Sequence, residues 1–452
     1  MNMRPYLLII TVMLAGWNGL QAQSAGIVEE YVQLGLANNL SLKARQLDIE
    51  KSILAVRQAK ALFYPTVNFE ANYTLAAGGR KIDFPIGDLL NPAYSTLNAL
   101  TGTNNFPVLE NQQIQFLPNN FQETKLTFAY PVYNTDLRYN RQIKELLTLN
   151  AEAQKAVYEQ ELAYQIRLAY LQYMQAVEAE KIWNNAQKVQ QELRRFNESL
   201  VKNNVATRDI IAETDYEISQ TEQQIFDLNS KQNTARAYVN FLLNRGFQEE
   251  IKADTAFAAQ MIPNYDLEQS IQTALSRRRE FNLLNSGKSI ANTVVDMNQA
   301  NKKRPDFYLG GETGFQGFGY KPGEQAYILA RVGMTYNLYD GGLQKNKIQE
   351  ARIEVDKMDN QIAQVQQQIS MQVTDRFNAL QSAKNAILSA EKGQKAAEEA
   401  FRIINNKYKA GQVLYLEWSN AQNRVTTAQL QTALSRLAAV QAHLNFLQAI
   451  AQ

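Results

Sequence analysis

Two long stretches of the chain carry apolar residues at the spacing of coiled-coil helices. Neither the stretch from Val132 to Ile262 nor that from Gly323 to Gln452 contains a proline. Apolar positions within both stretches recur at steps of three and four residues, which is the heptad rhythm. The clearest series are Ile182, Ala186, Val189, Leu193, Phe196 and Leu200 in the first stretch, and Val355, Met358, Ile362, Val365 and Ile369 in the second. We therefore predict long helices whose apolar seams pack against other helices.

Each helical stretch is interrupted once by residues that tolerate a turn. The interruptions are Lys202–Val205 and Lys409–Val413, which contain Asn and Gly, the residues that most readily adopt left-handed backbone conformations. Thr207 follows the first interruption and can cap the next helix. Each stretch is thus predicted to be a helical hairpin. The arms of the first hairpin, residues 135–201 and 207–245, would be about 100 and 58 Å long.

Four other segments alternate apolar and polar residues with the period of a strand. They are Thr66–Leu75, Lys125–Tyr133, Asp306–Phe315 and Ile328–Leu338. A length of about ten residues suits a tilted strand that spans a membrane. A soluble β-domain with one solvated face would show the same alternation, so periodicity leaves both interpretations open.

The order of helices and strands occurs twice along the chain. Tyr64-Pro65 and Arg304-Pro305 each end a predicted helix of about 22 residues and open a strand. The run Tyr130–Asn134 matches Tyr336–Asp340, and Asn203–Asp209 matches Gly411–Glu417. Such self-similarity predicts an internal structural duplication. The predicted domains are a first repeat over residues 23–246, a linker or equatorial segment over 247–266, and a second repeat over 267–452.

The N-terminus has the pattern of a secretory signal peptide. Arg4 supplies a positive charge, Tyr6–Trp17 is a short apolar run, and Leu20–Ala22 resembles a cleavage site. We predict a signal peptide over residues 1–22. Beyond Ala25 no continuous apolar run reaches the roughly 18 residues of a membrane-spanning helix. Any membrane that the exported protein crosses would therefore be crossed by strands.

Composition argues against most catalytic chemistry and predicts no bound cofactor or metal. The chain has no cysteine and one histidine, His443. It therefore lacks disulfides, thiol nucleophiles, a lipid-bearing cysteine and the partners for a histidine metal cluster. The 46 basic and 44 acidic residues give a net charge of +2, which disfavours a nucleic-acid partner. We predict that the protein is not an enzyme.

Four strands are too few for a membrane barrel made by one chain. Bacterial barrels have at least about eight strands, and an open sheet edge in lipid would leave backbone N–H and C=O groups unpaired. Several copies must then share one barrel, with eight strands from two copies or twelve from three. The arithmetic alone does not choose between these numbers. The predicted fold class is an α+β membrane protein, with a shared β-barrel continued by long antiparallel α-helical coiled coils.

Two motifs resemble the TolC family of outer-membrane efflux channels. They are Asn-Leu-Tyr-Asp-Gly-Gly at 337–342 and Tyr-Lys-Ala-Gly-Gln-Val at 408–413, set within the duplicated hairpins. The resemblance implies a homotrimer in the outer membrane, with a twelve-stranded barrel and a helical tunnel in the periplasm. It also implies docking to a periplasmic adaptor and an inner-membrane pump, in efflux or type I secretion. The channel would then be passive, because the pump supplies the energy.

The resemblance also points to residues at the hairpin turns. The turns lie at the membrane-distal end of the helices, where an adaptor could reach them. The docking candidates are Asn203, Asn204, Tyr408 and Gly411. The family carries acidic residues at its periplasmic constriction, which makes Asp209, Glu417 and Asn420 the gate candidates. Here Asn420 replaces a second acid and Val413 a basic residue. The acids could equally serve to stabilise the positive ends of their helices.

Two other function classes fit parts of the sequence. A secreted antiparallel coiled-coil scaffold or adhesin with a soluble β-module would have the same heptads and signal peptide. An exported hydrolase would need more than abundant carboxylates, which on heptad helices usually form a solvated face. Gly78–Asn120 is a long, non-periodic insertion between the first two strands. Its apolar residues suggest that it packs over the barrel mouth.

Overall fold

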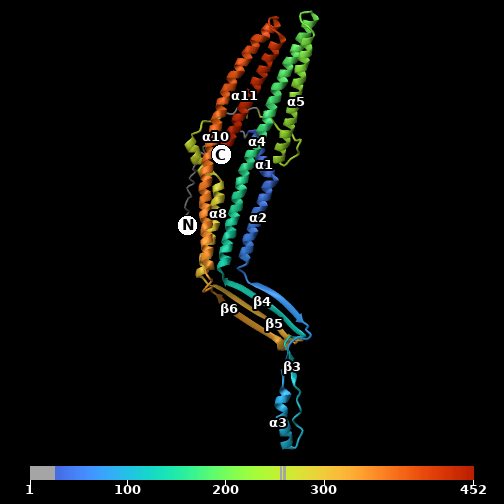
Figure 1. Cartoon of the computed structure of the whole chain (residues 1–452), viewed down its shortest axis with the longest axis vertical. Coiled ribbons are helices and arrows are strands. Elements are labelled where there is room, and N and C mark those ends of the chain that lie inside the picture. The colour runs from blue at the N-terminus through green and yellow to red at the C-terminus, as the bar shows by residue number, and fades with distance from the viewer. Residues whose placement is uncertain (1–25, 255–256, 258–260) are drawn as a thin grey trace, which may run out of the picture. The chain divides into compact units, whose positions relative to one another are not determined.

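The computed structural model describes residues 26–254, 257 and 261–452. Contacts divide the chain into two compact units (Figure 1). Unit 1 contains the chain up to Leu47 together with Ala153–Asn282 and Ile362–Gln452, and unit 2 contains Asp48–Glu152 and Leu283–Gln361. Both units draw on both halves of the sequence, whereas the predicted domains follow the two repeats in order. The predicted signal peptide, residues 1–22, lies outside the described residues.

The predicted helices are present with small changes at their ends. The longer ones are α2 (Leu40–Ala61), α4 (Thr135–Lys202), α5 (Asp209–Leu242), α8 (Glu280–Lys303), α10 (Leu343–Lys409) and α11 (Tyr415–Ala449). The shorter ones are α1 (Ile27–Asn38), α3 (Ile86–Thr101), α7 (Leu267–Arg277) and α9 (Pro322–Gln325). The two longest, α4 and α10, have 68 and 67 residues. No described helix is both long and apolar enough to cross a bilayer.

The core of unit 1 joins helices from both ends of the sequence. Val28 and Tyr31 of α1 pack against Leu162, Ile166 and Tyr170 of α4, with further members from α5 and α11. Tyr170 is fully buried. Its hydroxyl accepts a hydrogen bond from the backbone N–H of Asp254 at 2.8 Å and donates to the carbonyl of Lys252 at 2.9 Å. The chain that follows α5, part of the predicted linker, is thus fastened to α4.

The only histidine of the chain is half-buried beside a second core of unit 1. This cluster includes Val373 and Leu380 of α10 and Phe446 of α11. His443 Nε2 lies 2.7 Å from the hydroxyl of Tyr265, and burial lowers the pKa of the imidazole. The histidine therefore has a packing environment and an internal partner.

Unit 2 contains a four-stranded antiparallel sheet in the order β1-β4-β5-β6 (Figure 1). The strands are β1 (Thr66–Thr74), β4 (Phe121–Tyr133), β5 (Asp306–Phe318) and β6 (Ala326–Thr335). All four were predicted, but β6 ends at Thr335 and does not reach Leu338. The reason lies in its neighbour, because Asp306 pairs with Thr335 and is the first residue of β5 after Pro305. Residues 336–338 therefore have no strand beside them.

The motif after β6 starts α10 by capping it. Asp340 Oδ2 accepts a hydrogen bond from the Gln344 N–H at 2.8 Å, and its Oδ1 accepts one from the Gly342 N–H at 2.9 Å. These bonds favour the carboxylate and lower the pKa of Asp340. Gly341 and Gly342 adopt positive φ angles of 64° and 88°, which glycine tolerates without strain. At the start of α4, Asn134 accepts a bond from the Leu137 N–H in the same way.

The insertion between β1 and β4 is ordered, contrary to the prediction of a non-periodic loop. It contains a two-stranded hairpin of β2 (Lys81–Phe84) and β3 (Gln112–Gln115), with α3 between the two strands. The two strands are only four residues long, too short for an alternating pattern to stand out, and in α3 Gly87 and Pro92 are residues typical of loops.

Candidate functional site

The turns of the two helical hairpins lie at one end of unit 1 (Figure 1). Each turn contains one residue in the left-handed conformation, Asn204 with φ 57° and Gly411 with φ 71°. The N–H of the following residue donates to the carbonyl five positions earlier, from Val205 to Leu200 and from Gln412 to Lys407, both at 2.9 Å. This is the Schellman pattern of helix ends. The structural equivalent of Gly411 is therefore Asn204, one residue beyond the predicted match at Asn203.

The gate candidates lie on the exposed surface beside these turns. Asp209 is the first residue of α5, and the Thr207 hydroxyl donates a hydrogen bond to its carboxylate. Glu417 is the third residue of α11. The two acids therefore occupy different positions of their helices, whereas the sequence match predicts equivalent ones. Asp209, Glu417 and Asn420 are all exposed in the single chain. A carboxylate in a first helical turn is stabilised by the helix dipole.

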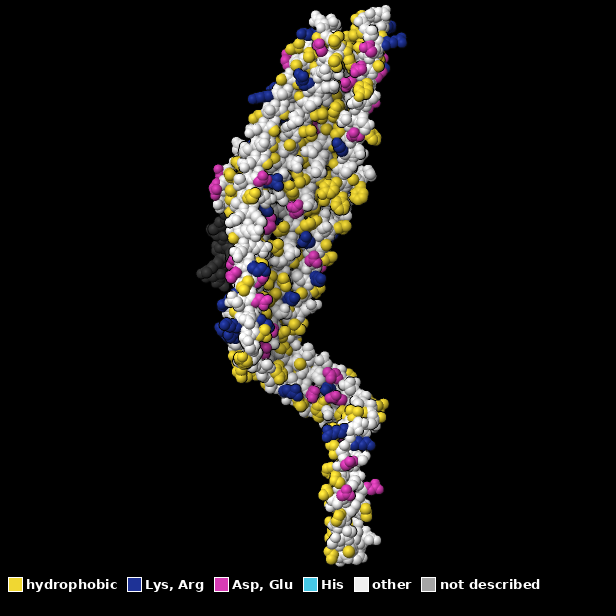
Figure 2. All heavy atoms as spheres, viewed as in Figure 1, with side chains coloured by type: hydrophobic (Ala, Val, Ile, Leu, Met, Phe, Trp, Pro, Cys, Tyr) yellow, Lys and Arg dark blue, Asp and Glu magenta, His cyan; other side chains and the backbone are white. Residues whose placement is uncertain are grey.

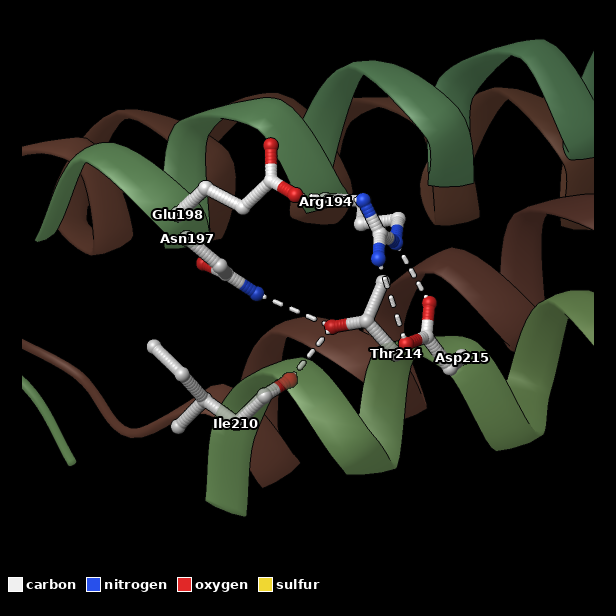
Figure 3. Close-up of polar contacts among 6 residues, drawn as sticks. All are labelled: Arg194, Asn197, Glu198, Ile210, Thr214 and Asp215. Atoms are coloured by element: carbon white, nitrogen blue, oxygen red, sulfur yellow. Dashed lines mark hydrogen bonds and ion pairs between the residues drawn. The ribbon is translucent and has the colours of Figure 1, made fainter. Parts of the chain in front are cut away.

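A buried chain of polar contacts joins the two hairpins just behind the turns. The Tyr408 hydroxyl of α10 donates to Asn197 Oδ1 of α4 at 2.8 Å. Asn197 Nδ2 in turn donates to Thr214 Oγ1 of α5 at 2.9 Å (Figure 3). The Thr214 hydroxyl closes the chain by donating to the Ile210 carbonyl at 2.6 Å. Asn197 and Thr214 are fully buried, so each contact satisfies a group that water does not reach.

Apolar and aromatic side chains enclose this polar chain. Leu193, Tyr408 and Trp418 form a buried cluster, with Phe196 and Phe401 packed against it. The ring of Tyr408 lies 6.1 Å from that of Phe196, and the ring of Trp418 lies 5.6 Å from that of Phe401. Burial raises the pKa of Tyr408 to about 12.

Three of the four docking candidates are exposed, and the fourth, Tyr408, is buried. Asn203, Asn204 and Gly411 are exposed and free to meet another molecule. Tyr408 is only 6% exposed and holds the hairpins together from inside. It cannot contact a partner directly and acts as a support for the turns. The heptad pattern could not reveal this, because Tyr408 and Asn197 are 211 residues apart in the sequence.

An ion-pair cluster ties α4 to α5 at the surface. Arg194 binds the carboxylates of Asp215 on α5 and Glu198 on α4 (Figure 3). All three side chains are 38–48% exposed, so solvent screens the attraction and its net contribution to stability is small.

A groove with small residues runs between α10 and α11 in unit 1. Its volume is about 520 Å³. The residues of α10 that line it are Ala386, Ser389, Ala390, Gly393, Ala396, Ala397 and Ala400. Side chains this small allow another helix to approach closely. Sequence reasoning missed this groove, although its small residues, glycine and serine included, recur at steps of three and four residues.

The described residues offer no metal centre. Within residues 26–254, 257 and 261–452, no three His, Cys, Asp or Glu side chains are placed to hold a metal ion.

Part of the chain matches a known protein family. Residues 271–452 match the family described as "Outer membrane efflux protein". The resemblance to outer-membrane efflux proteins is confirmed. A comparison with curated proteins gave no match.

Solved structures of outer-membrane channels share the fold of this chain over nearly its whole length. The outer membrane protein VceC from Vibrio cholerae has a TM-score of 0.71 at 15% identity, over 94% of this chain and 95% of VceC. CusC, described in a study of transmembrane channel formation, has 0.73 at 14%, over 94% and 91%. The MtrE outer membrane channel of Neisseria gonorrhoeae has 0.72 at 16%, over 94% and 89%.

The structural likeness reaches beyond residues 271–452, the part that matches the family. The family match covers residues 271–452, whereas the structural likeness extends over 94% of the chain and so includes the first hairpin and its strands. At identities of 14–16% the likeness establishes the fold of this chain.

Proposed function

We propose that the protein forms, as a homotrimer, the outer-membrane channel of a tripartite efflux or type I secretion system. Residues 1–22 act as the signal peptide for export. The helical parts stand in the periplasm and receive substrates from an inner-membrane pump through a periplasmic adaptor. The channel gives passive passage and catalyses no reaction. The family match and the fold shared with outer-membrane channels support this proposal.

The observation that carries the proposal is a sheet with two open edges and one exposed apolar face. Within the described residues, β1 pairs only with β4, and β6 pairs only with β5. Phe69, Ile328 and Val332 belong to the apolar face and are 69, 85 and 80% exposed. Lipid would cover such a face, but it could not satisfy the N–H and C=O groups of the two edges. Three copies joined edge to edge give twelve strands and leave no edge.

The opposite face of the sheet has the polarity of a channel lining. Lys125 Nζ lies 2.8 Å from a carboxylate oxygen of Glu123 and 3.8 Å from those of Glu70 and Glu312. Glu70 pairs with Lys125 across β1 and β4, so these charges share one face of the sheet. Charged side chains are tolerated in a membrane barrel when they face a watery lumen.

The hairpin turns are the proposed docking site for the adaptor. Asn203, Asn204 and Gly411 present their exposed backbone and amide groups, and Tyr408 supports the turns from inside. The groove with small residues on α10 and α11 can accept a helix of the adaptor alongside the turns.

The same end of unit 1 is the proposed periplasmic gate. Under threefold symmetry Asp209 and Glu417 would place six carboxylates around the channel axis, with Asn420 as an uncharged neighbour. Carboxylates so arranged attract cations and repel one another.

A secreted coiled-coil scaffold or adhesin is the second candidate, and the sheet does not favour it. A soluble β-module would bury one face against a core, whereas here Phe69, Ile328 and Val332 are exposed to a degree that is costly in water.

The number of chains in the assembly tests the proposal. Native mass spectrometry of the detergent-purified protein is expected to show a complex of three chains. A stable monomer that conducts ions in a bilayer would contradict it, since one chain supplies only four strands.

A further inference from the structure

The segment between β1 and β4 contains a helix that is fastened on one side. Asn91 and Asn98 of α3 each exchange two hydrogen bonds with the returning chain, Asn91 with the backbone of Leu109 at 2.8 Å in both directions. Asn98 donates to the Phe106 carbonyl at 2.7 Å and accepts from its N–H at 3.1 Å. The Tyr94 ring lies 5.4 Å from that of Phe106. One face of α3 is therefore built into a defined hairpin.

A different face of α3 carries an apolar seam with no partner in the described chain. Its residues are spaced by steps of four, three, four and three, which is the heptad pattern of a helix that packs on other helices: Ile86, Leu90, Ala93, Leu97 and Leu100. Leu90, Leu97 and Leu100 are 40, 39 and 78% exposed. Pro92 falls at an outer heptad position, where it does not interrupt the seam.

Beyond Asp88 in its first turn, α3 and the chain that returns beside it carry no charge as far as Leu109. The run from Leu89 to Leu109 contains no Asp, Glu, Lys or Arg. Hydrophobic and other uncharged side chains predominate on the visible side of the segment that holds α3 (Figure 2). An uncharged heptad seam is self-complementary, because identical helices meet without like-charge repulsion and Leu can pack against Leu.

We propose that α3 is a self-association surface, on which the α3 helices of three copies pack along this seam into a short parallel bundle. The inference rests on the proposed trimer. Its occupant is a second copy because α3 lies in the connection that leaves β1, and β1 is an edge where the neighbouring copy joins the sheet. Threefold symmetry then brings three identical seams around one axis, which is also the channel axis. The bundle forms a cap over the outer mouth.

Single cysteines test the seam directly, because the chain has none of its own. In the trimer, Leu97→Cys on the seam is expected to form covalent dimers on oxidation or with a short bismaleimide. The matched control is Ser95→Cys, which is exposed and lies on the opposite side of the helix. It is expected to remain monomeric on a denaturing gel.

Native mass spectrometry on the same samples separates the two proposals. If three chains are found but Leu97→Cys does not cross-link, or cross-links no better than Ser95→Cys, the bundle is contradicted and the trimer stands. Labelling of that unlinked cysteine by a membrane-impermeant maleimide on intact cells would show that the seam faces solvent or another partner. If no trimer is found, the proposed function itself fails.

A conductance measurement tests the cap. The double variant Leu90→Asp, Leu97→Asp places six carboxylates in the seam of the trimer and is expected to separate the helices, raising single-channel conductance and the uptake of a bulky antibiotic such as vancomycin. Ser95→Asp adds charge to the outer side of α3 and should change neither. An unchanged conductance in the seam variant, with the trimer intact, would overturn the cap.

Discussion

Tyr408 and Asn197 show how one buried contact can position a surface site. Neither residue meets solvent to a useful extent, yet together with Thr214 they link α10, α4 and α5 immediately behind the exposed turns. Both partners must be present, because a buried hydroxyl or amide without its hydrogen bond costs about 1–3 kcal/mol. The exposed residues of the turns therefore depend on residues that they do not touch.

Removing the Tyr408 hydroxyl should destabilise unit 1 in a pH-dependent way. Tyr408→Phe leaves Asn197 Oδ1 unpaired, and at neutral pH we expect a loss of about 1–3 kcal/mol in the free energy of unfolding. The folded-state pKa of Tyr408 is raised to about 12 from 10.0. The stabilisation is thus fully present below pH 10 and disappears as the pH rises through 12.

Denaturant titrations at several pH values measure this difference. Tyr216→Phe is the control, since Tyr216 is 60% exposed on α5. A difference between wild type and Tyr408→Phe that stays constant from pH 9 to about 12 would contradict the buried phenol.

The helices and strands could be predicted to a large extent, because their patterns are local. Residues 135–202 and 343–409 repeat the heptad over many turns, and the four strands of the sheet alternate along most of their length. The end of β6 could not be predicted, since it depends on where β5 begins. The helix α3 was missed because Gly87 and Pro92, which usually break helices, interrupt its apolar heptad pattern.

Of the candidate site, only the positions of the two turns could be predicted from the sequence. Asn and Gly mark the turns because only they adopt the left-handed conformation at low cost. The matching of Asn203 with Gly411 was out by one residue, because Asn203 and Asn204 are adjacent asparagines and either could adopt the left-handed conformation. The burial of Tyr408 depends on a contact between distant hairpins, and no local pattern encodes it.

A left-handed turn should reject a β-branched side chain. Gly411 has φ 71° and no atom within 4 Å of the place where a Cβ would lie, so the cost of Gly411→Val is conformational, about 1–2 kcal/mol. We expect the turn to be distorted, with loss of efflux and retention of the trimer.

Asn204→Gly is the matched change at the other turn. It replaces one residue suited to the left-handed conformation by another, and should preserve both stability and efflux. Drug-resistance assays and native mass spectrometry measure the two properties. Wild-type resistance in Gly411→Val would argue against the turns as the docking site.

At the scale of the assembled channel, the acids at the turns should decide which ions pass. Asp209→Asn with Glu417→Gln removes six carboxylates per trimer. We expect reduced cation selectivity and weaker block by divalent cations in planar bilayers. Asp227→Asn, an exposed acid further along α5, should have no such effect. Unchanged selectivity and block in the double variant would leave Asp209 and Glu417 as helix-end charges.

The two edges of the sheet make the whole account depend on several chains sharing one pore. The most direct test is the single-channel conductance of the purified wild-type protein after reconstitution in a planar bilayer. The account predicts discrete steps of ion conductance from the fraction that contains three chains, and none from monomers. A properly folded trimer that never conducts, or a monomer that does, would contradict it.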